Sequence, residues 1–265
     1  MPLATKAKYA YLAPLRIPTG FSSAAREHLI ALARAGLPIC GKDTAIPNLS
    51  FFLRNELITT FHELNELVDC PVGINPAFYA GPFEAMILHT TPDVTRHMGV
   101  PTFGFFVWET TRLPQGWADR INELDGMFTC SEFSAKLFRS GGVTKPIYIV
   151  GHPVDITLFN PDVPPITPLI QRPETIFMVT SQWHPRKGVD DVITAYLTEF
   201  TDKDSVGLLL FTWGGSHGSL ERDKIRRMIG HIREGLNVGN QPKIFYVGQN
   251  IPREAVPELY ALSDV

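Results

Sequence analysis

The sequence predicts an α/β protein in which two blocks of alternating strands and helices are joined by a proline-rich linker. Short apolar runs rich in β-branched and aromatic residues alternate with segments that have helical periodicity. Prolines at 161, 164, 165, 168 and 173 interrupt this alternation once, without any periodic pattern between them. We therefore expect a first domain over residues 1–160, a linker over 161–173 and a second domain over 174–265.

The first block opens with an apolar strand at 7–13, a turn containing Gly20, and a helix from Ser22 to Ala35 that stops at Gly36. Further strands are expected at 37–39, 85–89, 101–108, 126–130 and 145–151. Short helices are expected near 94–98, from Trp117, and after Ser131, which is a good N-cap residue. Residues 41–80 are broken by prolines, and only one helix, at 53–67, is predicted there.

In the second block, strands are expected at 175–180, 206–212 and 243–248, with helices at 189–200 and 221–235 and a last helix near Pro257. Strands that alternate with helices favour parallel sheets covered by helices. In such sheets ligands bind at the carboxyl ends of the strands, so the turns that follow each strand are the candidate binding segments.

The overall composition fits a soluble globular protein without a nucleic-acid footprint. Hydrophobic residues make up 44% and charged residues 19%, with a net charge of -3 and a pI near 6.2. The three cysteines are odd in number and widely spaced, which favours a reduced, cytoplasmic setting without disulfide framework or zinc site. No signal peptide or membrane-spanning run is predicted. The basic helix at 221–235 fits a solvated face; the alternative is peripheral contact with anionic lipid at the inner membrane surface.

Two turns are candidate anion sites. Arg186 and Lys187 lie between a buried strand and a helix N-terminus, where backbone N–H groups and the helix dipole also favour anions. An ordinary solvated turn is the alternative. Gly20 and Phe21 lie in the turn after the first strand, where a phosphate could approach the backbone, or where the chain simply turns. This turn lacks the GxGxxG fingerprint, which makes a nicotinamide oxidoreductase a weak alternative.

Other strand ends carry polar or aromatic residues with weaker signals. Gly214 and Gly215 open the loop GGSHGS, which would contact phosphate or serve as a flexible turn. Trp183 and Trp213 would stack on a base, although packing is the simpler interpretation. His89 and His152 are predicted to be structural, the latter together with Asp155.

Several segments, taken in order, resemble the retaining glycosyltransferases of GT-B fold, the family-four group. SEFSAKLFRSGGVTKPIYIVGHPVDITLFNP is followed by a strand and RKGVDDVITAYLTEF, as in that family. GFSSAAREHLIALARAGLPI resembles the family's glycine loop and first helix, and WETTRLPQGWADRINELDGMFTCSEFSA resembles a subgroup in which Trp-Glu follows a central strand. KIFYVGQNIPREAVPELYALSDV resembles the segment before the family's donor-sugar motif.

The resemblance implies two Rossmann-like domains with the active site in the cleft between them. The family has an arginine five residues before the lysine of its KG pair, whereas this chain has Gln182; Arg186 would take over. The family's Glu-x7-Glu stretch would follow Val265, so we expect the second domain to be incomplete, as in a C-terminally truncated protein.

The predicted chemistry is transfer of a hexosyl group from a nucleotide-sugar donor to a glycan, lipid or protein hydroxyl. The resemblance implies retention of configuration without a metal, with Arg186 and Lys187 stabilising the departing diphosphate. Glu109 would orient an acceptor hydroxyl or take its proton; the alternative is that it caps a turn or pairs with Arg112. Ser181, Gln182 and the glycines at 20, 214 and 215 would contact the donor, together with Phe21. The alternative is a sugar-nucleotide-binding or interaction module without turnover.

Overall fold

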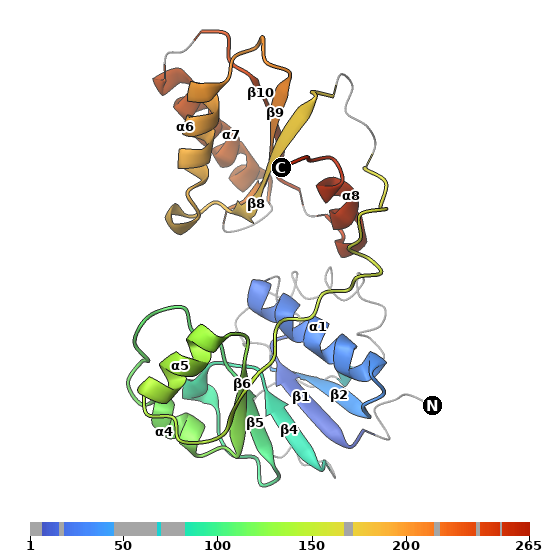
Figure 1. Ribbon diagram of the computed structural model, residues 1–265, viewed down its shortest axis with the longest axis vertical. Coiled ribbons are helices and arrows are strands. Elements are labelled where there is room, and N and C mark those ends of the chain that lie inside the picture. The colour runs from blue at the N-terminus through green and yellow to red at the C-terminus, as the bar shows by residue number, and fades with distance from the viewer. Residues whose placement is uncertain are drawn as a thin grey trace. The chain divides into compact units, whose positions relative to one another are not determined.

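A computed structural model shows two α/β units, residues 1–155 and 156–265, each with its own parallel sheet (Figure 1). The structure describes residues 7–15, 19–44, 68–69, 83–166, 172–214, 218–236, 239–249 and 251–265. The helix expected at 53–67 therefore lies outside the described residues. The α/β fold with two Rossmann-like units agrees with the sequence prediction.

The sheet of unit 1 has seven described strands, all parallel, in the order β3-β2-β1-β4-β5-β6-β7. Their bounds are β1 Tyr9–Ala13, β2 Ile39–Asp43, β3 Val68–Asp69, β4 Ala85–Leu88, β5 Thr102–Phe105, β6 Gly126–Thr129 and β7 Ile147–Ile149. The helical segments are α1 Gly20–Arg34, the 3-10 turn η3 Pro92–Val94, α4 Trp117–Asn122 and α5 Glu132–Ser140. Because β1 lies between β2 and β4, the strand order reverses direction at β1, next to the start of α1.

Alternate residues of β1 separate two cores in unit 1. Tyr11 and Ala13 pack with Leu29 of α1, whereas Ala10 and Leu12 belong to the core that α4 and α5 cover. Figure 1 shows α1 beside β1 and β2, and α4 with α5 near β6. Both faces of the sheet therefore carry helices, as a parallel sheet requires.

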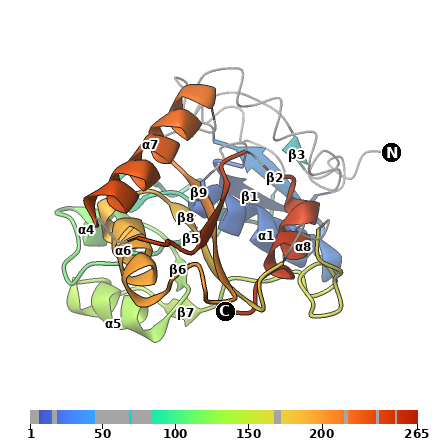
Figure 2. The ribbon, with the colours of Figure 1, turned by 90° about the horizontal axis from the view of Figure 1, so that it is seen from above.

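The sheet of unit 2 has three described strands in the order β10-β9-β8. They are β8 Thr175–Gln182, β9 Val206–Trp213 and β10 Lys243–Val247. The helical segments are the 3-10 turn η4 Pro185–Lys187, α6 Val189–Glu199, α7 Ser219–Gly235, the 3-10 turn η5 Arg253–Ala255 and α8 Val256–Tyr260. Helices α6 and α7 pack on one face of the sheet and α8 on the other (Figure 2).

The last residues of the sequence run alongside β8. Asp264 N donates to Ile176 O at 2.9 Å, and Met178 N donates to Val265 O at 2.8 Å. The Asp264 carboxylate also accepts both Arg172 Nη2 at 3.0 Å and Ile176 N at 2.8 Å. A single carboxylate therefore joins the end of the linker to the start of β8.

The division between the units falls before the prolines, at 155/156 rather than in 161–173. Residues of the expected linker pack within unit 2: Ile166 contacts the core under α8, and the Phe159 ring lies 6.4 Å from the Tyr260 ring. Apolar side chains thus assign the first part of the proline-rich segment to the second unit.

Several expected strands are shorter in the structure. The strand expected at 101–108 ends at Phe105, and Trp108 Nε1 instead donates to Arg112 O at 2.8 Å, which closes a turn. The strand expected at 145–151 is limited to Ile147–Ile149. The helix expected at 94–98 is a single 3-10 turn at Pro92–Val94, because Thr95 Oγ1 donates to Pro92 O at 2.7 Å and ends it.

Candidate functional site

The turn after β8 carries two adjacent cations, Arg186 and Lys187. Pro185–Lys187 forms a 3-10 turn, and Gly188 then adopts a left-handed conformation with φ of 62° that leads into α6. Arg186 N donates to His184 Nδ1 at 3.2 Å, so a side-chain ring fixes the start of this turn. Both cationic side chains are exposed. The backbone conformation thus presents Arg186 and Lys187 at the point where α6 begins.

The N-terminus of α6 has the orphan backbone donors that a helix start always has. Its N-cap, Gly188, makes no side-chain hydrogen bond to the first turn. Asp190 and Asp191 lie in that turn and interact favourably with the positive end of the helix dipole. These two carboxylates reduce the net positive charge that Arg186 and Lys187 give to the turn.

The ends of β8 and β9 bring three of the predicted donor-binding residues together. Gln182 Nε2 donates to Gly214 O at 3.1 Å, and Ser181 lies beside Thr212 in the parallel ladder. A Cβ at Gly214 would overlap the Glu221 carboxylate in its present rotamer, and a shift of that flexible side chain relieves the overlap. Gly215 lies outside the described residues.

Two buried hydroxyls lie at this same edge of the sheet. The side chains of Ser181 and Thr212 have buried oxygens with no hydrogen-bond partner within the part of the chain that the structure describes. Both residues follow the alternation that points Phe177, Val179, Leu208 and Leu210 toward α6 and α7. Unsatisfied hydroxyls beneath two helix starts are uncommon in native proteins and mark this edge as polar.

In unit 1, Gly20 is the first residue of α1, after the N-cap Thr19, whose hydroxyl accepts from Ser22 N at 3.2 Å. A Cβ at Gly20 would meet no atom within 4 Å, so the backbone there is open to approach. Phe21 is half-buried, and its ring packs edge-on against His89 with centroids 4.6 Å apart. Phe21 therefore has a packing role in addition to its predicted contact with a donor.

Glu109 does not lie at the tip of β5 as the sequence suggested, because that strand ends four residues earlier. It is an exposed residue in the irregular segment between β5 and α4. The preceding Trp108 packs in a T-shaped arrangement on Trp117 of α4, with ring centroids 4.6 Å apart. This aromatic contact anchors the segment that carries Glu109.

A cluster of histidines at the carboxyl edge of unit 1 was not predicted. Tyr11 Oη and His89 Nδ1 are 2.6 Å apart, and His28 Nε2 and His152 Nδ1 are 3.2 Å apart. The rings of His28 and His89 lie 6.0 Å apart, and Phe105 contacts both. No local pattern in the sequence connects His28 with His152, which lies 124 positions away.

Burial and mutual repulsion keep these histidines neutral. Burial, with a smaller contribution from His28 and His152, lowers the pKa of His89 from 6.5 to about 3. Burial, followed by the charge of His152, lowers the pKa of His28 from 6.5 to about 4. The pKa of the more exposed His152 is also lowered by burial.

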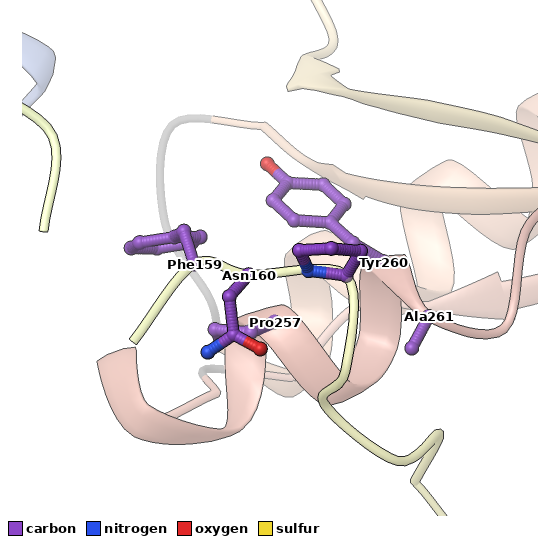
Figure 3. A pocket seen from close by; sticks show the side chains of 6 residues that line it. Phe159, Asn160, Pro257, Tyr260 and Ala261 are labelled. Carbon is purple, nitrogen blue, oxygen red and sulfur yellow. The ribbon is translucent and has the colours of Figure 1, made fainter. Parts of the chain in front are cut away.

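A pocket of about 310 Å³ lies on unit 2, between residues 159–161 and residues 257–261. Figure 3 shows Phe159, Asn160, Pro257, Tyr260 and Ala261 around it. The Asn160 amide is used internally, because Nδ2 donates to Thr157 O at 2.9 Å and Oδ1 accepts from Asp162 N at 3.0 Å. The pocket thus offers mainly apolar contacts, and none of the predicted site residues lines it.

The arrangement of two parallel, helix-covered sheets defines a class of fold, that of the GT-B glycosyltransferases. No family model matches the chain, and no curated protein sequence matches it. The evidence for the class is therefore structural similarity, which at these low sequence identities establishes the fold alone.

Three solved structures illustrate the similarity, and each aligns with 97% of this chain. A UDP-forming α,α-trehalose-phosphate synthase from Burkholderia xenovorans is 12% identical, with a TM-score of 0.57 over 76% of its own chain. A glycosyltransferase from Rickettsia africae is 12% identical, with a TM-score of 0.58 over 72% of its chain. A trehalose-6-phosphate synthase, studied with bisubstrate glycomimetics for glycosyl transfer with retention, is 13% identical, with a TM-score of 0.56 over 76% of its chain.

Proposed function

We propose that this protein is a retaining glycosyltransferase that moves a hexosyl group from a nucleotide sugar to a hydroxyl of a glycan, lipid or protein. The fold supports the general class, since similar structures include a UDP-forming synthase and an enzyme described as transferring with retention. Soluble, nucleotide-sugar-dependent enzymes on this fold provide the analogy; the residues of this chain must provide the chemistry.

The observation that carries the proposal is the turn after β8. Arg186 and Lys187 are held in a single 3-10 turn, which the left-handed Gly188 connects to the start of α6. Ligands of open parallel sheets bind at this end of the strands. A planar guanidinium, an ammonium group and backbone N–H groups are therefore combined where a diphosphate would bind.

In the proposed reaction, negative charge develops on the diphosphate as the bond to the sugar breaks. Arg186 would donate two parallel hydrogen bonds to phosphate oxygens, and Lys187 would act as a point charge. Both cations would act in place of a divalent metal, so no metal is required. Gly20, which leaves open space beside its backbone, would allow a ligand close to the start of α1, and Glu109 would orient the acceptor hydroxyl.

Peripheral membrane contact and a cytoplasmic location remain separate predictions. None of the described helices is long and apolar enough to cross a membrane. On α7, Arg226 pairs with Asp223 at 2.9 Å and Lys224 lies 3.9 Å from Glu221. These pairs partly neutralise the basic face that sequence alone made a candidate for anionic lipid.

The test is turnover of nucleotide sugars by the Arg186→Ala, Lys187→Ala double variant. We expect release of nucleoside diphosphate from the preferred donor, chosen from UDP-, GDP- and ADP-hexoses, to fall at least about a hundredfold, because each cation stabilises the transition-state charge. The matched control is Lys203→Ala, which removes an exposed cation on the far side of the same unit. Assays with and without a chelator test metal independence.

Equal turnover by the double variant and the Lys203→Ala control would contradict the role of the two cations. Donor binding without any transfer or hydrolysis would instead support the non-catalytic binding module. Absence of binding to every nucleotide sugar would contradict both functions.

A further inference from the structure

The last residues of unit 1, 151–155, are attached to α1 by two side-chain contacts. His152 Nδ1 lies 3.2 Å from His28 Nε2, and Asp155 Oδ2 accepts from Arg34 Nη1 at 2.9 Å. His28 and Arg34 are six positions apart, which corresponds to roughly 9 Å along the helix. The two contacts therefore hold the segment along α1 just before the chain enters unit 2 at residue 156.

The contact between the two histidines depends on proton occupancy. A hydrogen bond between two imidazoles needs one ring nitrogen that donates and one that accepts. His28 is only 6% exposed, and its ring lies 4.5 Å from the Phe105 ring. A first proton places a charge in this aromatic environment, and a second removes the remaining acceptor nitrogen. The buried charge is costly although the bond itself becomes charge-assisted, and loss of the acceptor removes the bond, so both additions disfavour the attached state.

The groups around this pair do not compensate a positive charge. From α1 come His28 itself and Arg34; from β1 comes Tyr11, whose hydroxyl is bound to His89; and after β4 comes His89. The segment contributes His152 and Asp155, of which Asp155 pairs with Arg34. Within the described residues, burial and the neighbouring histidines account for the lowered pKa values, and no carboxylate contributes.

We propose that His28 and His152 form a proton-sensitive latch, which holds residues 151–155 on α1 while both rings are neutral and releases the histidine end when they are protonated. The Arg34–Asp155 ion pair is the part of the attachment that does not need a neutral histidine. Neutral pH favours the attached state, because the attached pair resists protonation and the released pair does not.

Release of the histidine end frees residues 151–154, while the Arg34–Asp155 ion pair still holds the next residue on α1. Acidification thus loosens the segment that precedes unit 2 without unfolding either sheet. This device is independent of the proposed transferase activity, since none of its residues belongs to the β8 turn.

The experiment measures the mobility of a nitroxide spin label at position 151. A Cβ at Gly151 would meet no atom within 4 Å, so Gly151→Cys can carry the label without a clash. For a pKa of His28 that rises from about 4 when attached to an ordinary 6.5 when released, the opening equilibrium should increase roughly tenfold between pH 7.5 and 5.5. We expect the mobile component of the spectrum to increase accordingly.

Two variants separate the latch from general effects of acid. His28→Gln keeps a polar amide but cannot be protonated at position 28, so its pH response should be much smaller than that of the parent, with only His152 left to titrate at the contact. His97→Gln removes an exposed histidine of the same unit, which bonds Asp125 at 3.0 Å, and should respond like the parent. An unchanged parent spectrum, or a pH response in His28→Gln as large as in the parent, would overturn the proposal.

A direct measurement covers the case in which His28→Gln does not fold. Ring nitrogen NMR shifts of the parent protein report the protonation of His28 and His152 individually. We expect His28 to gain its proton over the same pH range in which the label becomes mobile. Mobility that changes while His28 remains neutral would contradict the latch, as would a protonated His28 with an immobile label.

Discussion

His89 is 1% exposed, and aromatic rings and a tyrosine hydroxyl surround it rather than carboxylates. Its Nε2 has no hydrogen-bond partner within the described residues. A charged imidazole would therefore lose its hydration without gaining an ion pair, so this ring is neutral in the folded protein. Stability at the residue scale consequently depends on pH through this side chain.

We predict that acid destabilises the protein through His89. In the unfolded chain His89 is protonated with a pKa near 6.5, whereas in the folded chain its pKa is about 3. Stability is therefore complete above pH 6.5 and declines between these values, by up to about 1.4 kcal/mol per pH unit for this one histidine. Urea unfolding at several pH values between 7.5 and 5 measures this slope.

The slope, rather than the absolute stability, is the informative quantity. His89→Gln should reduce it by about one proton, even if the substitution itself destabilises the fold. His97→Gln is the matched control for loss of a histidine elsewhere in unit 1, where the side chain is 40% exposed. An identical slope in His89→Gln and in the parent would show that another group titrates.

At the scale of elements, two helices begin with side-chain caps that the sequence contains in plain form. Ser131 Oγ accepts from Ser134 N at 3.2 Å at the start of α5, and Thr19 caps α1 in the same way. Each cap satisfies one backbone donor that the helix itself cannot satisfy. Such local devices explain why both helix starts lie close to their predicted positions.

We predict that Ser131→Ala lowers the free energy of unfolding by about 1 kcal/mol, because the Ser134 amide loses its acceptor. Ser131→Asn keeps a side-chain oxygen at the N-cap and should restore most of this loss. Thermal or urea unfolding of the three proteins measures the difference. Equal stability of the alanine and asparagine variants would argue against the cap.

Whether a segment is a helix or a strand was predictable where a single residue pattern indicated it. The residues at which strands end were harder to predict. The run PTFGFFVW contains nothing that stops a strand at Phe105; the strand ends because Trp108 packs on Trp117 and bonds the Arg112 carbonyl. Similarly, β2 continues through Lys42 and Asp43, which are only 6% exposed, although a charged pair favours a strand end in sequence reasoning. The ends of β5 and β2 are therefore set by tertiary contacts and not by local sequence.

At the scale of the whole molecule, each unit has its own apolar clusters. Ile193 of α6 is fully buried among residues of β9 and α7, all within unit 2. We predict that Ile193→Ala destabilises unit 2 by about 2–5 kcal/mol, because it removes buried methyl groups and leaves a cavity. Hydrogen exchange of the amides of β8 and β9 should accelerate accordingly.

The neighbouring position gives a matched control for this prediction. Val192 is 38% exposed on the same helix, so Val192→Ala should change exchange in β8 and β9 only slightly. If both variants accelerated exchange equally, propensity of α6 rather than burial of Ile193 would be the cause.

The candidate site was predictable only as separate pieces of chain. Arg186 and Lys187 were found because a strand, a basic turn and a helix start are contiguous in sequence, and the Gln182–Gly214 bond joins two strand ends that a parallel ladder aligns. The histidine cluster combines β1, α1, β4 and residue 152, and burial rather than any spacing makes it distinctive. Long-range contacts of this kind leave no local signature.

The strand order of unit 1 has a consequence for protein engineering. Since β1 lies between β2 and β4, the chain leaves β1 toward α1 on one face, while the helices that follow β4 cover the other face. In open parallel sheets, ligands bind outside the carboxyl ends of the strands at such a reversal of strand order. Libraries that aim to change what this unit accepts should therefore diversify exposed positions beyond these strand ends, such as Thr91, whereas the exposed turn 35–38 at the opposite rim is a suitable place for tags and labels.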